Sequence, residues 1–128
     1  MSLKSYSAYQ RVGEVCAMLD TIKLSKDQTK EIKMSDCGPV IECKVSFAGT
    51  DDDPVSVNAL RFEFTDHYVR ISLYKIIPFK VDDIDENVEL DAIMSVTYEK
   101  EVDGQTVPNH NFMKTIKGFL TMYGINFI

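Results

Sequence analysis

The sequence contains no tryptophan, only two histidines, and three cysteines that form no CxxC pair. A catalytic serine or cysteine needs a base beside it, and neither His67 nor His110 lies in a known catalytic motif. The spacing of Cys16, Cys37 and Cys43 fits neither a zinc site nor a disulfide framework, so we expect reduced thiols. These absences predict a protein that is not an enzyme and that holds no metal or cofactor.

Glycine is also scarce, with six residues scattered singly along the chain. No glycine-rich loop precedes a helix, so the sequence does not predict a nucleotide-binding phosphate cradle. No apolar run approaches the ~20 residues needed to cross a bilayer, and the first residues lack the apolar core of a secretory signal. We expect a soluble, cytoplasmic protein that does not associate with a membrane.

What the sequence does have is the composition of an ordinary globular protein, with 45% hydrophobic and 27% charged residues. Its 128 residues suit one domain over residues 1–128, which would bury about two-thirds of the unfolded surface. The formal net charge is −6, and two clusters of acidic residues account for the imbalance. These clusters are Asp51, Asp52 and Asp53, and then Asp82, Asp83, Asp85, Glu86, Glu89 and Asp91.

Both acidic clusters fall in expected loops or at the entrance to a strand, and the simplest interpretation is that they keep the protein soluble. The alternative is an acidic patch that imitates phosphates and occupies the basic site of a nucleic-acid-binding protein. Its residues would be Asp51, Asp52, Asp53, Asp82, Asp83, Asp85 and Glu86. A calcium loop is not predicted, because Val88 and Met94 stand where it needs glycine and a bidentate glutamate.

Two segments have the period of an amphipathic helix. From Ser5 to about Ile22, the expected apolar stripe is Tyr9, Val12, Val15, Cys16, Met18, Leu19 and Ile22. A second helix opens after Pro108-Asn109, with an apolar face of Phe112, Met113, Ile116, Phe119, Leu120 and Tyr123. Gly124 supplies its stop, and the apolar tail 125–128 is expected to dock on the domain or on a partner.

Between these helices, the alternation of apolar and polar residues predicts strands. Residues 30–35 and 40–47 alternate on either side of a turn, and residues 88–99 form the longest expected strand. The side chains expected on one face of that long strand are Val88, Leu90, Ala92, Met94, Val96 and Tyr98. Asp103-Gly104 is then expected to turn the chain.

The stretch 59–77 is the most informative part of the sequence, because it predicts a hairpin in one specific register. A two-residue turn at Asp66-His67 would place Thr65 opposite Tyr68 and continue the pairing toward both ends. The other expected pairs are Phe64/Val69, Glu63/Arg70, Phe62/Ile71 and Leu60/Leu73. All the apolar pairs then share one face, and a slip of one residue would destroy that match.

This order of elements predicts an α+β fold: an N-terminal helix, an antiparallel meander of four to five strands and a C-terminal helix, with both helices on one face of the sheet. The other face of the hairpin would display Arg61, Glu63, Tyr68, Arg70 and Tyr74. Tyrosine and arginine are enriched at protein interfaces, whereas a glutamate and an acidic chain repel phosphates.

The leading hypothesis is a small non-enzymatic protein-interaction module of the chaperone, adaptor or inhibitor type. Its partner would be another protein or a second copy of the chain, and binding would use the polar face of the sheet or the acidic loops. Two alternatives stay open. One is a sheet that stacks single-stranded nucleic acid, and the other is a metal-assisted enzyme that uses the clustered carboxylates.

Overall fold

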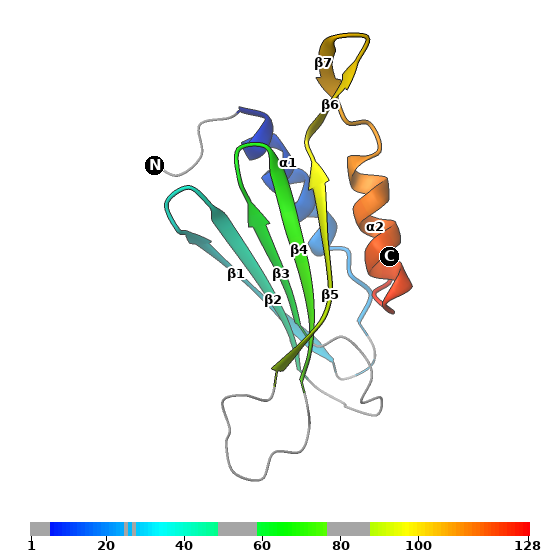
Figure 1. The fold of residues 1–128 in the computed structure, drawn as a ribbon. Helices are drawn as coiled ribbons and strands as arrows, with labels where there is room; N and C mark the ends of the chain where they lie inside the picture. The colour runs from blue at the N-terminus through cyan, green and yellow to red at the C-terminus, as the bar shows by residue number, and fades with distance from the viewer. Residues whose placement is uncertain (1–5, 25, 27, 49–58, 77–87) are drawn as a thin grey trace.

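The computed structural model describes residues 6–24, 26, 28–48, 59–76 and 88–128, and it confirms the α+β fold. Helix α1 (Tyr6–Leu19) precedes one five-stranded antiparallel sheet, and helix α2 (Phe112–Met122) ends the chain (Figure 1). The sheet contains β1 (Thr29–Asp36), β2 (Ile41–Ala48), β3 (Ala59–Phe64), β4 (Tyr68–Ile76) and β5 (Val88–Thr97). These strands pair in chain order, so β1 and β5 are the edges.

Both helices lie against the same face of the sheet, and α2 runs beside the β5 edge (Figure 1). One core cluster joins the buried residues of the two helices to alternate residues of the strands. The sheet contributes Cys43, Val45, Leu60, Phe62, Phe64, Val69, Ile71, Leu73 and Val96 to it. Burying this many apolar side chains on a single face stabilises the fold and leaves the opposite face, here called the outer face, to polar residues.

The predicted hairpin is confirmed in its predicted register. Phe64 pairs with Val69, Glu63 with Arg70, and the ladder continues to Ala59 and Tyr74. The turn does not need the glycine that two-residue hairpins favour, because the Thr65 hydroxyl accepts hydrogen bonds from the backbone N–H groups of the two residues that follow Asp66.

The apolar stripe of α1 differs from the expected one. Tyr9 is 44% exposed, and the fully buried residue at this end of the helix is Ala8. Ala8, Val15 and Leu19 lie on one side of a 3.6-residue helix, whereas Tyr9 is rotated about 100° away from Ala8. The small side chain of Ala8 therefore packs in the core, and the aromatic ring of Tyr9 lies at the boundary with solvent.

The expectation that the side chains from Val88 to Tyr98 alternate without interruption is wrong, because strand β5 contains an irregularity. Leu73 pairs with Ala92, but Tyr74 pairs with Leu90, so Asp91 is an extra residue in the ladder. Such a β-bulge puts the side chains before it on the opposite face from the one that strict alternation with the side chains after it would give. Leu90 consequently lies on the outer face with 51% of its surface exposed, instead of in the core.

The expected long strand also ends earlier, at Thr97, and Tyr98 lies fully buried at the junction with a separate hairpin. This hairpin, β6 (Glu99–Val102) and β7 (Gln105–Pro108), was not predicted, although its turn was. Asp103 and Gly104 have φ values of 50° and 79°, the left-handed pair that a tight hairpin turn requires.

Helix α2 ends as its sequence predicts. Gly124 has a φ of 91°, and the N–H groups of Gly124 and Ile125 donate to the carbonyls of Thr121 and Leu120, which is the Schellman arrangement. The tail then docks on the domain: Phe127 forms a bridge to Ile22, and Ile125 is buried. Within the described residues, neither helix is long and apolar enough to span a membrane.

Candidate functional site

The outer face is the surface on which the predicted site residues gather. Arg61, Glu63, Tyr68, Arg70 and Tyr74 all project from β3 and β4 on the side away from the two helices. No helix or strand among the described residues covers this side of the sheet (Figure 1). The structure thus brings together the set that the hairpin pattern proposed.

Like charges stand directly opposite each other on this face. Glu42 of β2 faces Glu63 of β3, and Lys44 faces Arg61. Such pairs repel when nothing intervenes. Arg61 bridges the two glutamates, because its guanidinium pairs with Glu42 through Nε and lies 3.4 Å from Glu63 through Nη2. Glu42 in turn contacts both Lys44 and Arg61, which offsets the repulsion between these two cations.

The result is a continuous ion-pair ladder across three strands. Arg70 Nε lies 3.1 Å from Glu63 Oε1, and Lys44 Nζ lies 3.6 Å from Glu42 Oε1. Arg61 also hydrogen-bonds to Tyr74; burial alone would lower the pKa of Arg61, but Tyr74, Glu42 and Glu63 raise it. The cations of the ladder are partly exposed to solvent, and ion pairs at a protein surface contribute about 1 kcal/mol or less each, so the ladder sets geometry more than stability.

Apolar and aromatic groups flank the ladder. Tyr68 is 39% exposed at the turn end, and Ile93 of β5, which faces the buried Ser72, is 52% exposed. A shallow depression lies over Ala59 and is bordered by Lys44 and Tyr74. Sequence reasoning missed Glu42, Lys44 and Ile93, because only the strand order places β2 and β5 beside the hairpin.

The predicted acidic patch, Asp51, Asp52, Asp53, Asp82, Asp83, Asp85 and Glu86, lies outside the described residues. The first residues of the possible calcium loop, 83–87, also lie outside the described residues. Among the residues that are described, no three histidine, cysteine or acidic side chains gather closely enough to hold a metal ion. His67 and His110 are both exposed.

Two of the three cysteines lie together beneath the sheet. Cys43 is fully buried on β2, and a hydrogen bond joins its thiol to that of the half-buried Cys16 on α1. Burial, reinforced by the neighbouring Cys16, raises the pKa of the Cys43 thiol to about 12. The pKa of Cys16 is also raised, first by burial and then by Asp20. A thiol that resists ionisation is a poor nucleophile, so these residues serve the core.

The raised pKa of Cys43 predicts a loss of stability in alkali. Unfolding returns this thiol to an ordinary pKa near 9, so the stabilisation is complete below that pH and is lost as the pH rises toward about 12. We expect the stability difference between wild type and Cys43→Ala to shrink by about 1 kcal/mol from pH 9 to pH 10 in urea unfolding. Cys37→Ala, which removes an exposed thiol, should keep the wild-type slope; equal slopes for all three proteins would contradict this expectation.

Comparisons with protein-family models, with curated proteins and with solved structures find no match to this chain.

Proposed function

We propose that this chain is a non-enzymatic protein-binding module that engages another protein through the outer face of its sheet. The observation that carries the proposal is the ion-pair ladder with its aromatic and apolar border, on a face that no described helix or strand covers. Fixed guanidinium groups beside tyrosine and isoleucine side chains offer a rigid surface with little entropy left to lose on binding.

The ladder also argues against the nucleic-acid alternative. Arg61 and Arg70 each already pair with a glutamate, and an approaching phosphate would meet Glu42 and Glu63 beside them. Binding of a nucleic-acid strand needs cations that can exchange their counterions for phosphates. A protein partner can instead satisfy both signs of charge on the same face.

A comparison of matched variants in affinity purification from native lysate tests this proposal. Tyr68→Ala and Arg70→Ala alter the outer face, whereas Tyr6→Ala and Lys100→Ala remove an exposed tyrosine and an exposed cation elsewhere. We expect a protein that wild type and both controls retain and that both outer-face variants lose. With that protein purified, each outer-face change should weaken binding by about tenfold or more.

The proposal fails if every variant retains the same proteins as wild type. It also fails if single-stranded oligonucleotides bind the purified chain at low salt and the outer-face variants abolish that binding. That result would show that the outer face binds single-stranded nucleic acid.

A further inference from the structure

The two edges of the sheet differ in charge. β1 carries Lys30, Glu31, Lys33 and Asp36, whereas residues 92–97 of β5 contain no charged side chain. Soluble proteins commonly guard an exposed sheet edge with charges, because its unpaired backbone groups recruit another strand. In this sheet the β1 edge has that protection along its length, whereas the part of the β5 edge after the bulge, residues 92–97, does not.

One hydrogen bond at the end of β5 shows which backbone groups face outward. Tyr98 N–H donates to His67 C=O at 3.2 Å, in register with the β4–β5 ladder. Bonded and non-bonded pairs alternate along an antiparallel ladder, so every second residue back from Thr97 directs its N–H and C=O away from β4. The Asn109 side chain agrees with this phase, because its amide donates to Thr97 C=O at 3.0 Å.

The open part of the edge is therefore formed by Ile93 and Ser95. No other described strand pairs with β5 on this side, and Asn109 caps the edge at Thr97. Ile93 is half exposed on the outer face, and Met94 points to the inner face toward α2. An incoming strand would find four free backbone groups here, two donors and two acceptors.

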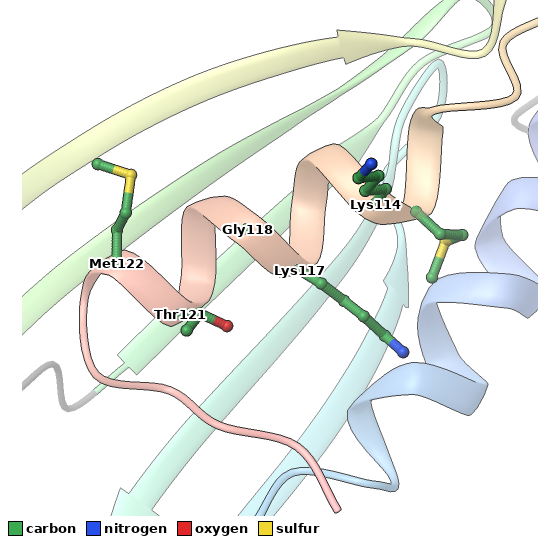
Figure 2. Close-up of a pocket in the computed structure, with 6 residues that line it drawn as sticks. Lys114, Lys117, Gly118, Thr121 and Met122 are labelled. Atoms are coloured by element: carbon green, nitrogen blue, oxygen red, sulfur yellow. The ribbon is translucent and has the colours of Figure 1, made fainter.

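Helix α2 continues this surface on the inner side. A groove between β5 and the helix is lined by Met94, Asn111, Lys114, Thr115, Gly118, Phe119 and Met122. Figure 2 shows Gly118 on α2 between Lys114 and Met122, and Met122 is 77% exposed. A Cβ on Gly118 would meet nothing within 4 Å, so packing inside this chain does not require glycine there. Glycine inside a helix costs about 1 kcal/mol relative to alanine.

We propose that a second copy of this chain occupies the β5 edge and the α2 groove, forming a dimer about a twofold axis at Met94. Ile93 of each copy pairs with Ser95 of the other, which joins the two five-stranded sheets into one. This register uses the free groups of both residues and ends before the carbonyl that Asn109 already occupies. A twofold axis makes the paired strands antiparallel, as their backbone phase requires.

Charge and shape are self-complementary about this axis. The segment 92–96, which would pair about this axis, has no charged side chain, so its pairing brings no like charges together, unlike β1. Met94 and Gly118 line the same groove, so the axis sets the two α2 helices antiparallel with Gly118 at their crossing. In that arrangement Lys114 lies against Met122 of the second copy, and its aliphatic stem covers the exposed thioether.

Light scattering after size exclusion tests the proposal with the full chain, whose monomer mass is 14.6 kDa. We expect the wild type to have twice that mass at high concentration. Ser95→Pro removes an outward N–H and no bond to β4, so the variant should fold and its dimer should dissociate about tenfold more readily or worse. Ile93→Lys should have the same effect, while Ser35→Lys, the same charge on the β1 edge, should leave the dimer intact.

Cross-linking tests the register. In a Cys37→Ser background, Met94→Cys should form a covalent dimer with oxidised glutathione, since facing non-bonded residues have the spacing of a disulfide. Ser35→Cys, on the β1 edge, should form no covalent dimer. A wild type that stays monomeric at high concentration, a dimer unaffected by both β5 variants, or a dimer that Met94→Cys does not cross-link would each overturn the proposal. Tyr68 and Arg70 lie on β4, outside the paired segment of β5, so Tyr68→Ala and Arg70→Ala should leave the dimer intact, and loss of partner binding in these variants is a result separate from loss of dimerisation.

Discussion

Replacing Phe62 with alanine is expected to lower the free energy of unfolding by about 4 kcal/mol. Phe62 is fully buried in the middle of the sheet, opposite Ile71, and its ring lies 6.2 Å from that of Phe64. Truncation would lose its apolar burial and leave a cavity that strands on both sides cannot close. Since domains are stable by about 5–15 kcal/mol, urea unfolding followed by circular dichroism should show a large shift of midpoint.

Leu90→Ala is the matched control, because uninterrupted alternation along β5 would place Leu90 in the core beside such residues. The bulge at Asp91 instead exposes Leu90 on the outer face, so its truncation should change stability by less than about 0.5 kcal/mol. Comparable losses from Phe62→Ala and Leu90→Ala would show that β5 continues without the bulge.

The hairpin was predictable because its information is local and redundant. A turn of two residues fixes the register, and the apolar alternation on each side of Asp66-His67 agrees with it. The Glu63–Arg70 pair adds a third signal, which the structure shows as an ion pair. Independent signals that converge on one register leave a single arrangement.

The bulge and the end of β5 were not predictable in the same way. One extra residue in a ladder leaves the alternation of the sequence unchanged, and Val88 to Tyr98 reads as one strand. What ends the strand is tertiary: Tyr98 inserts beneath the β3–β4 turn, which lies some thirty residues earlier in the chain. A sequence period carries no information about that contact.

The candidate site was predictable only in part, for a related reason. Arg61 and Arg70 are placed on the outer face by the hairpin itself, but their partner Glu42 arrives from β2. Ile93 lies at an edge because β5 is last in the order of the described strands, which no single strand reveals. The residues at the centre of the outer face can be predicted from the hairpin alone. The residues that border it depend on which strands lie beside the hairpin in the sheet.

Tyr98→Ala is expected to cost about 4 kcal/mol, as much as the truncation of Phe62. The ring is fully buried and meets Phe112 edge to face at 5.8 Å. Its hydroxyl lies 2.7 Å and 2.8 Å from the carbonyl oxygens of Thr65 and Tyr68. Its own carbonyl accepts a hydrogen bond from Arg11, so Tyr98 ties α1, the hairpin turn and the start of α2 together.

The variant Tyr98→Phe measures the contribution of the hydroxyl to stability separately from that of the ring. It should cost only about 1–2 kcal/mol at neutral pH, since the ring still fills its site and one hydrogen-bond donor is lost. Burial raises the pKa of the Tyr98 hydroxyl, so the folded chain keeps a proton that the unfolded chain releases above about pH 10. Stability is therefore complete below that pH and falls as the pH rises beyond it. In urea unfolding, Tyr98→Phe should lose less stability than wild type between pH 10 and pH 11; a parallel loss in both proteins would mean that the hydroxyl is not buried.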